Sequence, residues 1–323
     1  MAFIKLEEER VMNHKLYHLL MFFILVYGMT LPVFPDSLNF TSKHGSLSKK
    51  EEVMKKPGLG NPIVHEIVEN VYAIVDLYMP VKGIGVNAGI IFTDSSIVFI
   101  DAGMSIASAE FIWRFASKKK KEFENVYLII THGHTDHFFG MRIFKENEAD
   151  IIGHHILEKE LKDEKGQYFR FIMEKFEWDL QEAKKFLGDV EVSVPNKLIY
   201  KDTILKIDGE KVHILYTPGH YPDELSVYHP SSGTLFAGDT IYEGINPNTR
   251  FGGPEEWRTW ISQLERLKEL DVKTIVTGHG KLCTVAEIDR NIRFLKERIK
   301  ASGYERSVEK PFSQKDHSEI KDK

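Results

Sequence analysis

The sequence predicts an α/β protein in which two β-sheets pack together between helical layers. Its folded part has two strand-rich halves, and segments with helical spacing follow the strands in each half. At 323 residues, 42% of them hydrophobic, the chain is long enough for one large α/β domain or two modest ones. Its single cysteine, Cys283, excludes an internal disulfide, so packing of the core must hold the fold together.

An apolar segment lies near the amino terminus. Residues 16–35 contain no Asp, Glu, Lys or Arg. A segment of this kind is typical of a secretory signal or a membrane anchor. Pro32 and Pro35 near its end argue against a buried core helix. We therefore expect residues 1–35 to be a signal peptide or a membrane anchor, and the folded domain to be secreted or membrane-anchored, outside the cytoplasm.

The sequence leaves two details of this segment open. Glu7, Glu8 and Glu9 precede it, which is unusual for a signal peptide, whereas a start at Met12 would give a conventional positively charged lead. No small-residue cleavage site is evident, so the segment is either removed or retained as an anchor. Residues 36–62 are polar and charged, and we interpret them as a linker.

The first half of the folded domain is expected to begin near Ile63 with β-strands. Strands are predicted within residues 63–75, 87–92, 97–103, 126–131 and 150–153, and helices within 107–121, 140–147 and 155–187. The order strand, helix, strand between residues 97 and 131 implies a crossover between parallel strands. The long helical stretch should end before Pro195.

The second half repeats the scheme with different lengths. Strands are predicted at residues 203–207, 211–217, 225–229, 234–238 and 273–277, and helices from 254 onward and over 285–300. Pro254 suits the first position of a helix, where its missing amide hydrogen costs nothing. We therefore expect one domain over residues 63–302, followed by a charged tail over 303–323.

The strongest chemical signal follows the predicted strand at 126–131. The segment THGHTDHFFG places His132, His134, Asp136 and His137 within six residues. Alternate residues of an extended segment point the same way, so His132 and His134 can converge on one ion while the next turn reaches a second. A helix cap is the structural alternative, but four bunched titratable groups are costly without partners. Imidazole and carboxylate at this density favour zinc, with iron and manganese as alternatives.

Three further residues end strands or lie in glycine-rich turns. They are His220 in TPGH, Asp239 in AGDT and His279 in GHG. Each alone is a weak signal, because such residues are common in surface turns and helix caps. As a set they are informative, since all three follow apolar strands and functional sites gather at strand-end loops.

These motifs carry a family resemblance. In the order THGHTDH, TPGH, AGDT and GHG, with IDAG around Asp101, they resemble the five signatures of the metallo-β-lactamase fold superfamily over roughly residues 63–300. The resemblance implies a four-layer αββα sandwich and two metal ions per chain. It implies that the ligands are His132, His134 and His220 on the first metal, Asp136, His137 and His279 on the second, and Asp239 between them. Asp101 would be a buried acid that braces the site.

The resemblance also implies a hydrolase with a small-molecule substrate. Asp239 within GDT is similar to the glyoxalase-II-like thioesterases and the lactonases, and His134 stands where flavodiiron proteins carry Glu. A hydroxide shared by two metals would attack the carbonyl of an ester, thioester, lactone or lactam, with Asp136 as the catalytic residue that orients it. The alternatives are a non-catalytic zinc-binding module, or a nuclease or oxygenase branch of the same fold.

The sequence says less about substrate and partners. His154, Tyr242 and Arg250 lie near the predicted ligand loops and are candidates for substrate contact. The net charge of −5 disfavours nucleic acid as a partner, a membrane partner would act through residues 16–35, and the oligomeric state is undetermined. Aromatic residues at helical spacing form either an apolar lid or ordinary core, and we favour core. These are Tyr168, Phe169, Phe171, Phe176 and Trp178.

Overall fold

The computed structural model describes residues 56–163 and 167–303, and every structural statement below concerns these residues. The predicted signal or anchor over 1–35, most of the predicted linker and nearly all of the predicted tail lie outside them. Within the described ranges, no helix combines the length and the apolar character needed to cross a membrane.

The first sheet contains seven strands that lie side by side in chain order. The strands are β1 (Gly60–Val68), β2 (Val71–Val81), β3 (Ile84–Phe92), β4 (Ser96–Ile100), β5 (Asn125–Ile129), β6 (Asp150–His154) and β7 (Lys197–Ile199). Strands β1 to β4 pair antiparallel, whereas β4 to β7 pair parallel. The parallel pairing of β4 with β5 is the predicted crossover.

The second sheet contains five strands in the order β12, β11, β10, β9, β8. The strands are β8 (Thr203–Ile207), β9 (Glu210–Tyr216), β10 (Leu225–His229), β11 (Thr234–Gly238) and β12 (Thr274–Thr277). All its pairs are antiparallel except β11 with β12. This sheet follows the predicted strands within one residue at either end.

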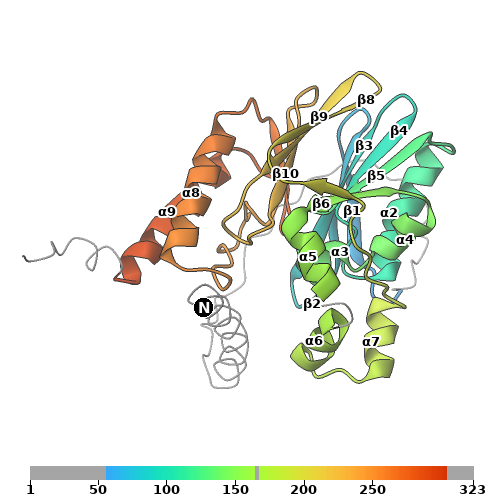
Figure 1. Cartoon of the computed structure of the whole chain (residues 1–323), viewed down its shortest axis with the longest axis horizontal. Helices are drawn as coiled ribbons and strands as arrows, with labels where there is room; N and C mark the ends of the chain where they lie inside the picture. The colour runs from blue at the N-terminus through green and yellow to red at the C-terminus, as the bar shows by residue number, and fades with distance from the viewer. Residues whose placement is uncertain (1–55, 164–166, 304–323) are drawn as a thin grey trace, which may run out of the picture. The chain divides into compact units, whose positions relative to one another are not determined.

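Helices cover the outer faces of both sheets. They are α2 (Ile106–Lys119), α3 (Thr135–Phe138), α4 (Met141–Glu146), α5 (His155–Asp163), α6 (Gln167–Lys175), α7 (Leu180–Leu187), α8 (Pro254–Lys268) and α9 (Ala286–Ala301). Figure 1 shows α2 and α4 beside the first sheet and α8 and α9 beside the second. The predicted architecture of two sheets between helical layers is confirmed.

Three hydrophobic clusters hold these layers together. Successive residues of a strand point to opposite faces, so β2 contributes Tyr72 and Ile74 to the cluster under the helices of the first half, and Ala73 and Val75 to the cluster between the sheets. The outer face of the second sheet packs on α8 and α9, where Trp260 is completely buried. The central strands of each sheet are therefore buried on both faces, which explains their continuous apolar sequences, whereas the edge strands β1 and β8 are largely exposed.

The structure differs from the sequence prediction in several elements. Residues 155–163, 167–175 and 180–187 form separate helices instead of one long one. Helix α6 ends before α7 because Glu177 adopts a left-handed conformation (φ 54°) and Asp179 caps α7 by accepting a hydrogen bond from the amide of Glu182. Strand β7 was not predicted. Strand β1 begins at Gly60, within the predicted linker.

Candidate dinuclear metal site

Four loops that follow strands bring the predicted ligands together. Residues 130–134 lead from β5 into the short helix α3; His132 and His134 lie in this loop, and Asp136 and His137 lie in α3. The other three residues lie beyond the second sheet: His220 after β9, Asp239 directly after β11 and His279 after β12. The site therefore joins one loop of the first sheet to three loops of the second.

Three histidines form the first half of the site together with Asp239. His132 Nε2 lies 2.9 Å from His134 Nδ1, and His220 Nε2 lies 3.2 Å from the same atom. Asp239 Oδ2 is 3.5 Å from His220 Nε2. This is the grouping that the family resemblance implied for the first metal.

Asp136, His137 and His279 form the second half. Asp136 Oδ2 lies 3.2 Å from His279 Nε2 and 3.5 Å from His137 Nε2. Asp239 reaches this half as well, because its Oδ1 is 3.4 Å from His137 Nε2 and its Oδ2 is 3.5 Å from His279 Nε2. Asp239 thus contacts both halves, as a bridging carboxylate would.

The spacing of these atoms fits metal ions. Four ligands about 2.05 Å from a zinc ion at the corners of a tetrahedron lie about 3.3 Å apart. Neighbouring ligand atoms in the two halves lie 2.9 to 3.5 Å apart, and all the ligand atoms of each half lie within 4.8 Å of one another. His134 Nε2, His137 Nε2 and Asp239 Oδ1 are buried and have no hydrogen-bond partner among the described residues. Two of these atoms, His137 Nε2 and Asp239 Oδ1, point at the other ligands of the second half.

The two halves differ in electrostatics. Burial and the neighbouring imidazoles lower the pKa of His134 to about 3, and burial also lowers the pKa of His132 and of His220. In the second half, burial alone would lower the pKa of His279, but the effect of Asp239 and Asp136 is larger and raises this pKa to about 10. The first half therefore offers neutral imidazoles ready to bind a cation, and the second offers carboxylates that attract positive charge.

Asp101 fixes the loop that carries the first four ligands. Its Oδ1 accepts a 2.8 Å hydrogen bond from the backbone amide of Thr131, and its Oδ2 accepts one of 2.9 Å from the Thr131 hydroxyl. The same Oδ2 lies 2.8 Å from His137 Nδ1, and Thr131 Oγ1 lies 3.0 Å from His132 Nδ1. One buried carboxylate thus orients His137 directly and His132 through Thr131, without being a ligand itself.

Backbone carbonyls and a tyrosine orient the remaining ligands. His220 Nδ1 lies 3.1 Å from the carbonyl of Asn248, and His279 Nδ1 lies 2.8 Å from the carbonyl of Gly85. These contacts favour a proton on Nδ1, which leaves Nε2 free to bind metal. The hydroxyl of Tyr242 donates a 2.6 Å hydrogen bond to Asp239 Oδ2.

The three candidates for substrate contact take different positions. Tyr242 is buried within the site and touches a ligand. His154 is buried at the end of β6, where its ring stacks on Tyr216 at a centroid distance of 4.3 Å. Arg250 is exposed in the loop between β11 and α8. Contact of any of them with substrate stays a prediction.

The sequence reasoning missed Phe251. Its ring is 42% exposed, lies 4.5 Å from the ring of His134 and packs 5.5 Å from Tyr221. It occurs in an irregular loop without hydrophobic periodicity, so no sequence pattern marks it. The helical aromatic residues behave mainly as core: Tyr168, Phe169, Phe176 and Trp178 pack against the first cluster, and Phe171 is 54% exposed.

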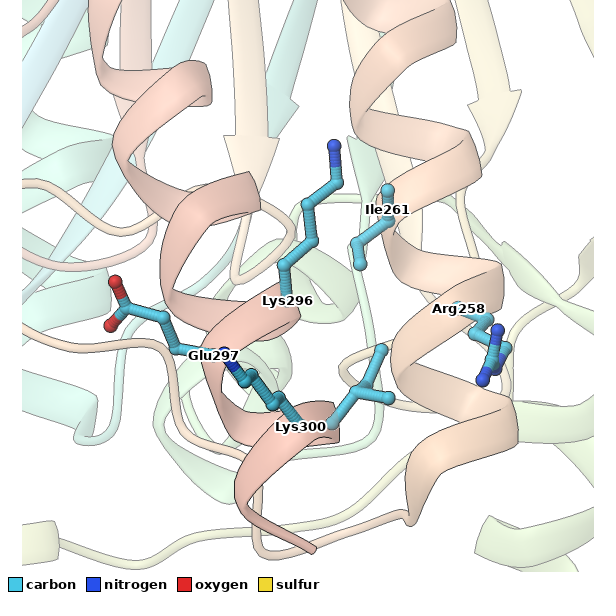
Figure 2. A pocket seen from close by; sticks show the side chains of 6 residues that line it. Arg258, Ile261, Lys296, Glu297 and Lys300 are labelled. Carbon is cyan, nitrogen blue, oxygen red and sulfur yellow. The ribbon is translucent and has the colours of Figure 1, made fainter. Parts of the chain in front are cut away.

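A surface hollow of about 490 Å³ lies elsewhere, against α8 and α9 (Figure 2). Its lining consists of Arg258, Ile261, Lys296, Glu297, Ile299 and Lys300. None of these six residues is a His or an Asp, so the hollow is separate from the metal site.

Comparison with known proteins agrees with this geometry. The sequence profile of the Metallo-beta-lactamase superfamily matches residues 81–279. The hydroxyacylglutathione hydrolase GloC of Haemophilus influenzae is 27% identical over 185 residues, which cover 53% of this chain and 76% of that protein. The probable metallo-hydrolase YqjP of Bacillus subtilis is 24% identical over 205 residues, 58% of this chain and 64% of the relative.

Solved structures show the same fold. A metallo-beta-lactamase from Pontibacter korlensis is similar with a TM-score of 0.55 and 18% identity, over 73% of this chain and 99% of that one. The structure of TMB-1 gives a TM-score of 0.58 and 20% identity, over 76% of this chain and all of the other. At these identities the likeness concerns the fold alone.

Proposed function

The chain belongs to the metallo-beta-lactamase superfamily of hydrolases, and on that basis we propose that it binds two zinc ions and hydrolyses a small ester or thioester. The observation that carries the proposal is the convergence of seven ligand residues from four loops, with neighbouring ligand atoms 2.9 to 3.5 Å apart. A structural zinc site is closed by four ligands, whereas seven residues with one shared carboxylate leave coordination positions for water and substrate.

The ligand chemistry favours zinc. Five imidazoles and two carboxylates make up the ligands. Nitrogen-rich sites of this composition suit zinc, although iron and manganese accept the same residues. A pair of divalent ions held there would lower the pKa of coordinated water toward neutrality and polarise the substrate carbonyl.

The residues of the chain have separate tasks in this reaction. Asp101, Tyr242 and the carbonyls of Gly85 and Asn248 keep the ligands in one orientation. Asp136 is 8% exposed, and its neighbours His137 and His279 keep its pKa below the ordinary value despite burial. It is therefore an ionised carboxylate at the edge of the site, able to accept a proton from water and pass it to the leaving group.

The position of Phe251 favours a substrate with an apolar group. Among the large hydrophobic side chains that are exposed in the described residues, it alone has a ring contact with a ligand histidine. An apolar side chain at this place offers a surface for an acyl chain or an aryl group next to His134. We therefore propose a substrate with an apolar group adjacent to the carbonyl, either on its acyl side or on its leaving group.

A hydrolysis screen of the full chain tests the proposal. The zinc-loaded protein is assayed against acyl and aryl thioesters, aryl esters, lactones and β-lactams, and zinc is counted by metal analysis. We expect about two zinc ions per chain and turnover of thioesters or aryl esters. His134→Ala and Asp239→Ala should abolish turnover while the circular dichroism spectrum is retained, and Glu146→Ala, an exposed change on α4, should leave turnover intact.

Other outcomes would contradict the proposal. A single bound iron would instead favour an oxygenase, and turnover of β-lactams alone would move the chain to the lactamase branch. Zinc binding without turnover of any class would leave a non-catalytic zinc module.

We also propose that residues 16–35 direct export or anchor the protein, as their composition predicts. Cell fractionation tests this idea. Recovery of the intact chain from the cytoplasm would contradict it.

A further inference from the structure

Glu224 is a buried acid that the proposed ligand set leaves out. It directly precedes β10 and closes the loop that carries His220. Its side chain is completely buried. Its backbone carbonyl accepts a 2.9 Å hydrogen bond from the amide of Thr217, which fixes the base of that loop.

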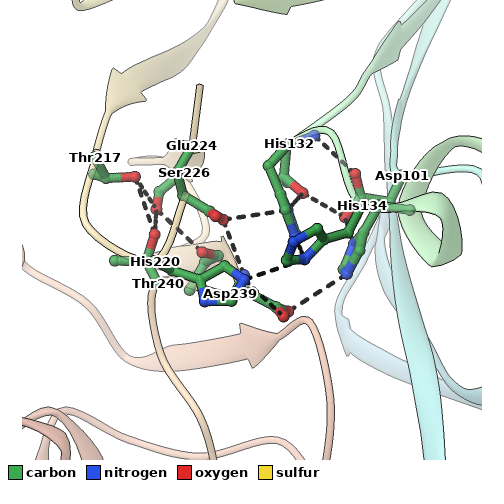
Figure 3. A network of polar contacts seen from close by, with 12 residues as sticks. Asp101, His132, His134, Thr217, His220, Glu224, Ser226, Asp239 and Thr240 are labelled. Carbon is green, nitrogen blue, oxygen red and sulfur yellow. Dashed lines mark hydrogen bonds and ion pairs between the residues drawn. The ribbon is translucent and has the colours of Figure 1, made fainter. Parts of the chain in front are cut away.

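The carboxylate of Glu224 contacts ligands from two further loops. Its Oε1 accepts a 3.0 Å hydrogen bond from the backbone amide of Asp239 and lies 3.5 Å from His132 Nδ1 (Figure 3). A methyl group added at Gly238 would lie 2.6 Å from the same Oε1. The backbone before Asp239 can therefore approach the carboxylate this closely only because residue 238 has no side chain.

A carboxylate at this position is costly to the fold. Glu224 Oε2 is buried and has no hydrogen-bond partner among the described residues. Burial of an unsatisfied polar atom destabilises the fold. A leucine of similar size would fill the space without this cost, so packing alone does not account for Glu224.

From these contacts we infer that Glu224 is a positioning residue that holds Asp239 and His132 in register for metal binding. The inference rests on the proposed function, because it assigns both partners as zinc ligands. The carboxylate of Asp239 contacts both halves of the site. A fixed backbone at residue 239 would therefore position this carboxylate for both proposed ions. The hydrogen bond from the Asp239 amide is the contact that does this.

Two substitutions of similar size separate positioning from packing. In Glu224→Gln the amide oxygen can still accept the hydrogen bond from Asp239, whereas Glu224→Leu fills the space without an acceptor. Zinc affinity of the full chain is measured by competition with a chromophoric chelator, which needs no turnover. His229→Gln is the control, because His229 is buried at the opposite end of β10 and contacts Ser232.

We expect Glu224→Leu to lose zinc affinity about 10- to 100-fold, the range for residues that orient metal ligands. Glu224→Gln should lose clearly less, and His229→Gln should bind zinc like the natural protein. Equal zinc affinity in the Gln and Leu variants would overturn the inference. Zinc binding by the natural protein without turnover of any substrate would overturn the proposed function alone.

Discussion

Replacement of Asp101 by asparagine should weaken metal binding while the fold remains. The backbone amide of Thr131 donates to Asp101 Oδ1 and is a donor in every protonation state. In Asp101→Asn the side-chain oxygen must therefore stay at this position, and the new NH₂ group must face His137 Nδ1. His137 Nδ1 would then accept a hydrogen bond, which moves the ring proton to Nε2.

That proton occupies the atom that the second metal needs. His137 Nε2 lies 3.5 Å from Asp136 Oδ2 and 3.4 Å from Asp239 Oδ1, among the proposed ligands. Changes of this kind in residues that orient metal ligands lower affinity about 10- to 100-fold, or about 1.4–2.8 kcal/mol. The contact with the Thr131 backbone amide is preserved, but the Thr131 hydroxyl loses its acceptor, so the metal-free variant should lose about 1–3 kcal/mol of stability.

Chelator competition and thermal unfolding measure these two effects separately. We expect one of the two zinc ions to be held more weakly in Asp101→Asn, with a cooperative unfolding transition retained. Asp101→Ala should be less stable, because it leaves the Thr131 amide, the Thr131 hydroxyl and His137 without their buried acceptor. Unchanged affinity for both ions in Asp101→Asn would refute the tautomer argument.

Three further outcomes are expected. Gly278→Ala should abolish zinc binding without unfolding the chain, because the added methyl carbon would lie 2.0 Å from Asp239 Oδ1. Gly253→Ala is the control. Its methyl carbon would meet no atom closer than 3.5 Å, so this variant should bind zinc like the natural protein. Phe251→Ala should raise KM for aryl thioesters roughly tenfold. Phe171→Ala, an exposed change outside the site, should leave KM unchanged. Equal KM values in the Phe251→Ala variant and the natural protein would show that Phe251 does not contact the apolar group of the substrate. Removal of zinc by a chelator should lower the unfolding temperature, because zinc present at about a thousand times its Kd stabilises the folded state by about 4 kcal/mol. An unchanged unfolding temperature would show that zinc does not stabilise the folded chain.

The sequence predicted the two sheets and their helices, and it placed the proposed ligands at strand ends, because both depend on short-range patterns. The central strands were visible as apolar runs, since they are buried on both faces. The residues proposed as ligands come shortly after the ends of these strands. Their position at the edge where those strands end could therefore be predicted. His132, His134, Asp136 and His137 lie within six residues of one another in the chain, so their proximity could be predicted from this segment alone. In the structure all four belong to the two groups of the site.

Other features depend on contacts between distant residues and leave no local pattern in the sequence. The break near Glu177 falls within an uninterrupted helical spacing, and a left-handed backbone at that residue became visible only in the structure. Glu224 stands in a polar stretch that resembles an ordinary turn, while its role depends on Asp239, fifteen residues later. Phe251 is one exposed aromatic residue among several, and only its contact with His134 distinguishes it.

The position of the site between the sheets links its geometry to the packing of the whole domain. The amide of Asn87, on β3 of the first sheet, donates to the carbonyl of Gly278 beside His279, and its side chain donates to the carbonyl of Thr277. The amide of Leu225, on β10 of the second sheet, donates to the carbonyl of Thr131 beside His132. Each sheet thus fixes the backbone next to a ligand carried by the other. A shift between the sheets would separate the ligands, so the apolar cluster between the sheets sets the precision of the site as well as the stability of the fold.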